Sequence, residues 1–171
     1  MPRPNASDYP TYFDTYIKLV SEEDIMPVLQ SQHVDFANFI RSIPESDAIV
    51  LHTPYTWSIK QVIGHLIDSE IVFGYRALCF ARGDVTALPA FDENLYVANA
   101  NFNDLSIVQL ADHFYALRQS TICMFKKFST AAWNSSGQAG SGRMSVSAAA
   151  YVLVGHIRHH GAIIKKRLHP S

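Results

Sequence analysis

Apolar residues recur at helical spacing in four stretches of this chain, and no stretch alternates strictly between apolar and polar positions. The four stretches are residues 21–43, 57–82, 104–128 and 145–168. Ser21 and Ser145 are the expected N-caps of the first and last helices, although Pro27 allows the first helix to start later. This pattern predicts an all-α protein, a four-helix bundle with long connections.

The segments between these helices have no such period. Residues 1–20 are rich in proline and tyrosine, and we expect an extended N-terminal arm that lies on the body of the protein. Residues 83–103 and the glycine- and serine-rich residues 129–144 are too long for tight hairpins, so the topology need not be simple up-down-up-down. No internal repeat is visible, and we expect residues 1–171 to form a single domain.

The charge of the chain is nearly balanced, with 14 Lys and Arg residues against 15 Asp and Glu residues. This balance gives no basic face for a nucleic acid or an anionic membrane, so we expect neither partner. No targeting signal and no apolar run of membrane-spanning length are visible. Cys79 and Cys123 lie within helical patterns and are interpreted as small buried residues in a reducing compartment. We therefore expect a cytoplasmic protein.

Histidines gather in the closing segment, VLVGHIRHHGAIIKKRLHPS, which holds four of the eight in the chain. At about 100° per residue, His156 and His160 lie about 40° apart on the apolar stripe of the last helix. His159 lies at the border of that stripe. Two imidazoles spaced i, i+4 can bind one ion. The alternative is a pair of hydrogen-bonded core histidines without a metal.

A third ligand is available on the second helix, where His65 lies on the apolar side. His65, His156 and His160 together would leave an open coordination position, which is typical of a catalytic rather than a structural zinc site. We expect a divalent ion, zinc first, with nickel, iron and manganese as alternatives. Weaker candidates are His33, His52, His113 and His169.

Several segments resemble one protein family in this order and spacing. WSIKQVIGHLIDSE resembles the second helix of the DinB superfamily, and HIRHHGAIIKKRL resembles its last helix. LPAFDENLYV, RQSTICMF and MSVSAAAYVLVGH extend the resemblance over residues 35–168. It implies a four-helix bundle in which His65, His156 and His160 hold a divalent metal. The family includes thiol S-transferases that use low-molecular-weight thiols such as bacillithiol, thiol-dependent isomerases, and proteins labelled metal-dependent hydrolases.

These observations lead to one enzymatic hypothesis and one alternative. The first is a metal-dependent thiol S-transferase or hydrolase-like enzyme that acts on a small electrophile, with a small-molecule thiol as partner. The second is a non-catalytic, metal-loaded stress or sensor module. Asp68 is the candidate general base beside the ligands. Arg76 and Arg118 lie on apolar stripes, where each is either paired with a carboxylate or a clamp for a substrate anion.

The second helix is apolar on two sides, whereas a bundle helix needs only one buried stripe. The second side must be covered either by the N-terminal arm or by another copy of the chain. Twofold pairing is the commonest way to cover such a surface, and the family resemblance also favours it. We therefore expect a homodimer with this helix at or near the interface. The two stripes are Val62, Leu66, Val72 and Phe73, and Ile63, Ile67, Ile71 and Leu78.

Overall fold

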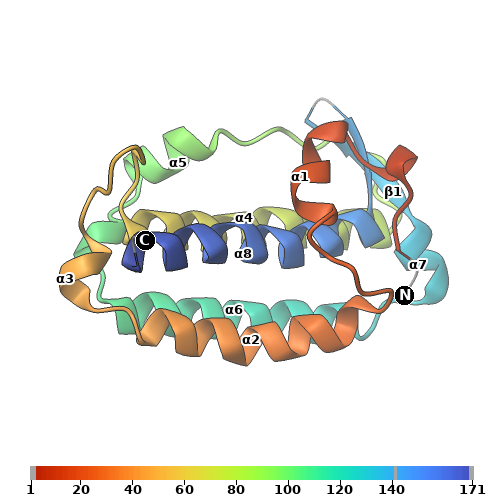
Figure 1. Ribbon diagram of the computed structural model, residues 1–171. Helices are drawn as coiled ribbons and strands as arrows, with labels where there is room; N and C mark the ends of the chain where they lie inside the picture. The colour runs from red at the N-terminus through yellow and green to blue at the C-terminus, as the bar shows by residue number, and fades with distance from the viewer. Residues whose placement is uncertain (1–2, 141, 170–171) are drawn as a thin grey trace.

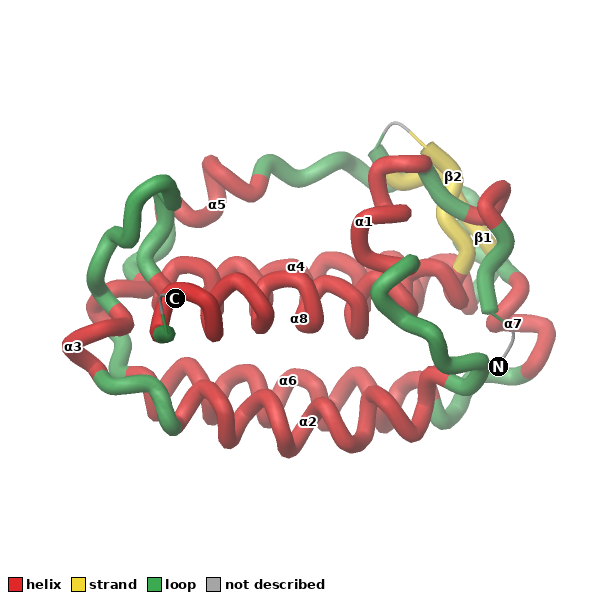
Figure 2. Tube along the Cα trace, in the orientation of Figure 1, coloured by secondary structure: helices red, strands yellow, loops and turns green. Residues whose placement is uncertain are grey.

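A computed structural model describes residues 3–140 and 142–169 of the chain. Within these residues, four long helices lie side by side (Figures 1 and 2). They are α2 (Ile25–Arg41), α4 (Ile59–Ala81), α6 (Ile107–Phe125) and α8 (Val146–Leu168). Helices α2 and α4 each pack against both α6 and α8, which closes the bundle. The predicted four-helix bundle is thus confirmed. In the described part of the chain, no helix has the length and apolar character needed to span a membrane.

The long connection between α4 and α6 sets the topology. It returns along the outside of the bundle and contains α5 (Glu93–Asn99) and the short 3-10 helix η3 (Phe102–Asp104). Helices α4 and α6 therefore run in the same direction, with α2 and α8 opposed to them (Figure 1). This is not an up-down-up-down bundle, an outcome that the long loops left open. The connection between α2 and α4 contains only one short helix, α3 (Glu45–Ala48).

Polar caps fix where the long helices begin. Ser145 caps α8, as predicted, by accepting a hydrogen bond from the backbone of Ala148. Ser21 does not cap α2; Asp24 does, because Pro27 has no N–H to donate and fits the first turn of a helix that starts at Ile25. Helix α6 starts after its cap Ser106 rather than near Asp104, which lies in η3.

The N-terminal arm lies on the body, but its described residues are not extended. They form η1 (Ala6–Asp8), η2 (Thr11–Phe13) and α1 (Asp14–Ile17), and α1 packs against α8. Asp14 explains part of this coiling, because it accepts hydrogen bonds from the hydroxyl of Tyr9 and the amine of Lys18. Residues 1–2 of the predicted arm lie outside the described residues.

The glycine-rich connection before α8, which the sequence indicated as a loop, contains a short hairpin. After α7 (Thr130–Asn134), strands β1 (Ser136–Ala139) and β2 (Gly142–Ser145) pair antiparallel. Gly140, at the turn, has a φ of +59°, which glycine adopts readily. The hairpin also exchanges backbone hydrogen bonds with Leu88, so main-chain pairing holds it without any apolar alternation.

Helix α4 is buried on two sides within the chain itself. Ile63 and Ile67 of its second stripe are fully buried in a cluster that includes residues of α6, whereas Ile71 is 48% exposed. The arm instead contacts the first stripe, where the rings of Phe13 and Phe73 lie 5.6 Å apart. The expectation that the arm or a partner must cover the second stripe was therefore wrong for most of its length.

Two further expectations about single residues can be compared with the structure. Cys79 is buried as expected, but Cys123 is exposed, and both thiols are free.

Arg118 of α6 is fully buried and forms two hydrogen bonds of 2.8 Å to the carboxylate of Glu70 on α4. This bidentate pair compensates the positive charge of the guanidinium, whose burial without a partner would be costly. Arg118 therefore has a structural role.

Candidate metal centre

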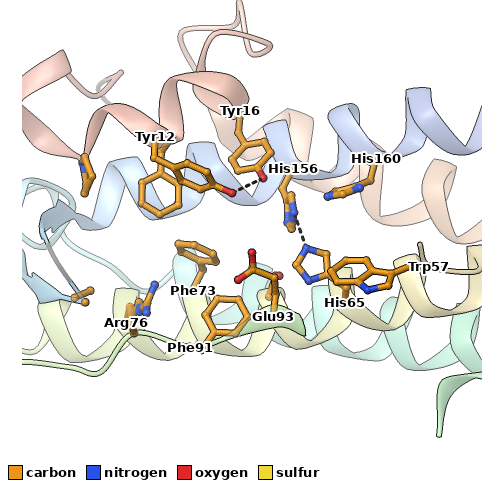
Figure 3. Close-up of a pocket in the computed structure, with 16 residues that line it drawn as sticks. Tyr12, Tyr16, Trp57, His65, Phe73, Arg76, Phe91, Glu93, His156 and His160 are labelled. Atoms are coloured by element: carbon orange, nitrogen blue, oxygen red, sulfur yellow. Dashed lines mark hydrogen bonds between the residues drawn. The ribbon is translucent and has the colours of Figure 1, made fainter. Parts of the chain in front are cut away.

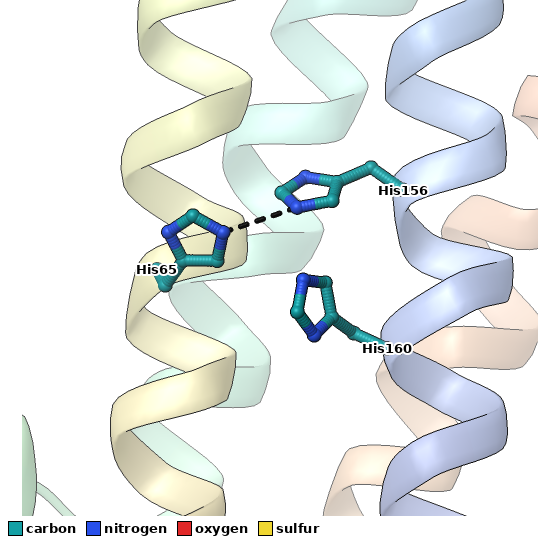
Figure 4. A group of neighbouring side chains, drawn as sticks. All are labelled: His65, His156 and His160. Carbon is teal, nitrogen blue, oxygen red and sulfur yellow. Dashed lines mark hydrogen bonds between the residues drawn. The ribbon is translucent and has the colours of Figure 1, made fainter. Parts of the chain in front are cut away.

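The three histidines selected from the sequence meet between α4 and α8. His65 comes from α4, and His156 and His160 come one turn apart from α8 (Figure 4). One ring nitrogen of each lies within 4.8 Å of those of the other two. Helical periodicity in two separate segments thus predicted side chains that meet in the structure. His65 and His156 are 91 residues apart in the sequence.

Burial keeps these imidazoles uncharged. Loss of hydration lowers the pKa of His65 to about 4 and that of His160 to about 3, and it lowers the pKa of the buried His156 well below its ordinary value. The Nε2 atoms of His65 and His156 lie 3.0 Å apart and share a hydrogen bond. At neutral pH each ring is therefore an uncharged imidazole with one nitrogen lone pair, and an ion bound by the cluster would replace the hydrogen bond between His65 and His156.

This donor set fits a divalent ion. In a tetrahedral zinc site with Zn–N bonds of about 2.1 Å, the nitrogens are about 3.4 Å apart. The present cluster, with its ligand atoms within 4.8 Å of one another and two of them 3.0 Å apart, has this scale. Three uncharged nitrogen ligands from two packed helices suit zinc. Imidazole ligands also bind nickel, iron and manganese, so the ligand type alone does not select among these metals.

The remaining histidines lie elsewhere. His159 is partly buried and packs edge-on against Tyr16, with ring centroids 5.5 Å apart. His33 forms a hydrogen bond with the carbonyl of Tyr115, and His52 lies 3.4 Å from a nitrogen of Arg167. His113 and His169 are exposed. None of these five belongs to the cluster formed by the described residues.

A glycine precedes a clustered histidine on both helices. A Cβ atom at Gly64 would lie 2.3 Å from the ring of Phe102, and one at Gly155 would lie 2.1 Å from the carbonyl oxygen of Tyr16. Segments from outside the bundle, η3 on α4 and α1 on α8, therefore rest directly on the helix backbone beside the ligands. Neither approach is compatible with a larger side chain.

The histidines form one end of a pocket of about 410 Å³. Its walls come from the arm, α4, α8, the hairpin and the crossover connection (Figure 3). Aromatic rings dominate the lining, and three polar side chains other than the histidines and tyrosines join them: Ser69, Arg76 and Glu93. The aromatic residues are Tyr12, Phe13, Tyr16, Trp57, Phe73 and Phe91.

The carboxylate that shares the pocket with the histidine cluster is that of Glu93, not that of Asp68. Glu93 lines the pocket, and its negative charge opposes the effect of burial on the pKa of His65. In Figure 3 its carboxylate lies in the pocket between Phe73 and His65. Asp68 does not line the pocket, and the charge that acts on it is that of His113 on α6, so the structure does not support the expectation that it is the general base.

Sequence reasoning missed Glu93 because its position depends on the crossover connection. Asp92 caps α5 by accepting hydrogen bonds from the backbone of Asn94 and Leu95, which is a local signal readable in the sequence. That α5 then packs against α4 near the histidines is a tertiary contact with no local signature.

The bundle and the cluster define a class: an all-α protein with three converging histidines at the wall of an aromatic pocket. The family profile of the DinB superfamily matches residues 29–164. The chain belongs to the DinB superfamily.

Two solved structures share this fold. One is YfiT from Bacillus subtilis, described as a probable metal-dependent hydrolase with an unusual four-helix bundle topology; it is 16% identical, with a TM-score of 0.68 over 96% of this chain and 90% of that one. The other is a mycothiol-dependent maleylpyruvate isomerase, 11% identical, with a TM-score of 0.68 over 90% of this chain and 62% of that one. No curated protein sequence gives a significant match.

Proposed function

We propose that the protein is a divalent-metal-dependent thiol S-transferase or hydrolase-like enzyme that acts on a small electrophile. The observation that carries this proposal is the position of His65, His156 and His160, which line an open pocket rather than a closed core. The descriptions of YfiT as a probable metal-dependent hydrolase and of the isomerase as mycothiol-dependent support it at the level of the family.

Of these two chemistries, we favour transfer of a small-molecule thiol. Uncharged ligands leave a divalent ion its full charge, which favours an anionic thiolate as the further ligand. When bound, such an ion lowers the pKa of a coordinated thiol or water toward neutrality. Zinc is the proposed ion, with nickel, iron and manganese as alternatives.

Residues of the chain supply the remaining steps. Glu93 accepts the proton of the incoming thiol, because its carboxylate lies beside the histidines within the pocket. The sulfur then forms a bond to carbon of the electrophile, the leaving group departs with its electron pair, and Glu93 returns the proton to it. Burial raises the pKa of Tyr16, so its hydroxyl stays protonated and can donate a hydrogen bond. Trp57, Phe73 and Phe91 pack against the organic part of the substrate and exclude water.

Metal analysis of untagged protein and a conjugation assay test this proposal. The metal-loaded protein should couple a low-molecular-weight thiol to a model electrophile. Glu93→Gln should lower the turnover rate by about 10² or more, as expected for the loss of a general base, with unchanged metal content. Glu23→Gln, an exposed carboxylate outside the pocket, is the matched control and should leave the rate unchanged.

Two results would contradict parts of this proposal. Tightly held metal, with no turnover of any thiol and electrophile pair or of an ester and amide panel, would favour the non-catalytic metal-loaded stress or sensor module. Equal rates for Glu93→Gln and the parent would remove Glu93 from the mechanism but leave the metal centre.

We also propose the setting in which the protein works. Residues 1–171 form a single domain, because both clusters of buried apolar side chains draw on the same long helices. The free thiols Cys79 and Cys123 suit a reducing compartment such as the cytoplasm. The protein is a homodimer that pairs through the exposed part of α4, where Ile71 and Tyr75 are 48% and 55% exposed.

A further inference from the structure

The end of the pocket opposite the histidines contains a buried arginine that the proposed reaction does not use. Arg76 is 6% exposed and lines the same pocket as the metal cluster. In Figure 3 it lies at the far end from His65, with Phe73, Phe91 and Glu93 between them. The pocket therefore combines a candidate metal centre at one end with a fixed positive charge at the other.

One stripe of α4 connects these two ends. His65, Ser69, Phe73 and Arg76 follow each other at spacings of four, four and three residues, which places them on one face of the helix. The eleven residues from His65 to Arg76 correspond to about 16 Å along the helix axis. The side chain of Arg76 leans toward the helix N-terminus, so its guanidinium lies closer to the histidines than this. An elongated small molecule can span that separation.

Arg76 is held in place but not neutralised. Its Nη2 donates a 2.9 Å hydrogen bond to the carbonyl oxygen of Pro89, and its guanidinium lies 5.2 Å from the ring centre of Phe73 and 5.9 Å from that of Phe91. Among the described residues no carboxylate pairs with it, and burial alone lowers its pKa. The fully paired Arg118 on α6 shows how the same fold treats a structural arginine.

An unpaired, buried guanidinium needs an anion. A guanidinium has five N–H donors, of which one is used here. Leaving such a charge buried without a partner is costly, and a bound carboxylate would satisfy it through two parallel hydrogen bonds.

A second polar group without a partner lies between the two ends. The hydroxyl oxygen of Ser69 is buried, lines the pocket and has no hydrogen-bond partner within the described residues. Ser69 lies one helical turn from His65, among aromatic and apolar neighbours. A buried hydroxyl in this state is a donor available to a ligand. On the same stripe of the pocket, Arg76 thus lacks an anionic partner and Ser69 lacks a hydrogen-bond partner among the described residues.

We propose that Arg76 binds the carboxylate of an elongated substrate whose reacting end lies at the histidines, and that Ser69 donates a hydrogen bond to its middle part. A carboxylate suits this end better than a phosphate, because Glu93 already adds a negative charge to the pocket and Arg76 is its only arginine or lysine among the described lining residues. The carboxylate belongs either to the thiol or to the electrophile. The reaction at the histidines rests on the proposed function, whereas the binding of the carboxylate does not.

Calorimetric titration of the full chain, loaded with zinc, tests this assignment with two pairs of probes. Mercaptohexanoate and mercaptohexanol share a thiol and differ in the carboxylate; phenylbutyrate and phenylbutanol lack the thiol. At least one acid should bind about tenfold more tightly than its alcohol, as expected for charge-assisted hydrogen bonds. A preference only in the mercapto pair assigns the carboxylate to the thiol, and one only in the phenyl pair assigns it to the electrophile.

Variants of α4 separate Arg76 from the metal as the source of this preference. Arg76→Gln removes the charge but keeps a polar side chain and should abolish the preference, and Arg76→Lys should retain part of it. Arg82→Gln removes the same charge from an exposed position outside the pocket and should keep the preference in full. Equal affinities of acid and alcohol in the parent, or a preference that persists in Arg76→Gln, would overturn the proposal.

The proposed function fails separately. If the cobalt-substituted protein shows no thiolate absorption band with mercaptohexanol, thiol binding at the metal is wrong. The phenyl pair still decides the role of Arg76 in that case, and it does so even in a chain that retains no zinc.

Discussion

Each histidine of the cluster contributes one nitrogen and no charge, because burial lowers the pKa of all three. In the proposed metal centre, affinity therefore comes from geometry, because α4 and α8 hold the three rings close together. Removal of one ring takes away a third of the ligand set and leaves a polar gap in a buried wall.

Single substitutions should therefore separate ligands from bystanders. His65→Ala, His156→Ala and His160→Ala should each lose stoichiometric metal, because two imidazoles from the chain hold a divalent ion far more weakly than three. His159→Ala should retain it, since its ring packs against Tyr16 outside the cluster. Elemental analysis after dialysis against a weak chelator is the measurement. Full stoichiometry in any of the first three variants would exclude that residue as a ligand.

Sequence reasoning works well for these histidines because a helix wheel needs only local periodicity. The same reasoning placed Asp68 beside the ligands, but a residue three positions from His65 points about 60° away and faces α6 instead. Glu93 was out of reach, because nothing local shows that the connection carrying it crosses above α4. The buried pairing of Arg118 with Glu70 joins two helices 48 residues apart in sequence and was equally invisible.

The N-terminal arm is the element whose attachment matters most for the pocket. Arg158 of α8 holds it, with hydrogen bonds of 2.9 and 2.7 Å to the carboxylate of Glu22 and one of 2.8 Å to the carbonyl of Leu19. The hydroxyl of Tyr151 donates to the carbonyls of Glu22 and Glu23, each at 2.9 Å. These contacts fasten the end of the arm that follows Tyr12 and Tyr16, which form part of the pocket wall.

Acid should weaken this attachment in a defined range. The hydrogen bond from Arg158 lowers the pKa of Glu22 from 4.5 to about 2. A lowered folded-state pKa means that the stabilisation is complete above pH 4.5 and is lost as the pH falls toward 2. Urea unfolding of Glu22→Gln and of the parent should differ by about 0.5 kcal/mol at neutral pH, the size of a partly exposed ion pair, with the parent more stable.

That difference should shrink between pH 4.5 and 2. Glu23→Gln, in which the neighbouring exposed carboxylate is removed, should match the parent across the range. A difference between Glu22→Gln and the parent that stayed constant with pH would show that charge is not what fastens the arm.

Among the secondary-structure elements, the sequence predicts the long helices. It does not predict the elements that depend on strand pairing or on contacts between distant parts of the chain. The hairpin β1–β2 contains glycine and serine with no apolar alternation, so no pattern distinguishes it from a loop. The arm contains proline and tyrosine, which favour no long element, and its short helical turns depend on side-chain caps such as the pair of Asn5 and Asp8.

Over the whole molecule, the bundle could be predicted because four amphipathic segments of similar length leave few alternatives. The surface of α4 that is left for a second copy of the chain could not be predicted as well as the bundle. A second apolar side on α4 indicated a partner, but α6 runs parallel to α4 and covers Ile63 and Ile67 within the chain. The surface left for a second copy is the part of α4 around Ile71 and Tyr75.

A homodimer through this surface has a direct test. Light scattering at micromolar concentration should show a dimer for the parent and a monomer for Ile71→Glu, because a buried, unpaired carboxylate opposes association. Val34→Glu changes a residue of similar exposure (45%) on α2, which lies away from α4 in Figure 1, and should stay dimeric. A monomeric parent would exclude the dimer outright.

The glycines that precede His65 and His156 give the scaffold a property that the four helices alone do not have. At each of them a segment outside the bundle rests on helix backbone, Phe102 at Gly64 and Tyr16 at Gly155. A methyl group at either position would clash with that segment, so the segment and the helix could no longer pack as closely there. Protein engineers can therefore change the surroundings of this cluster from two separate sides without substituting any of its three histidines.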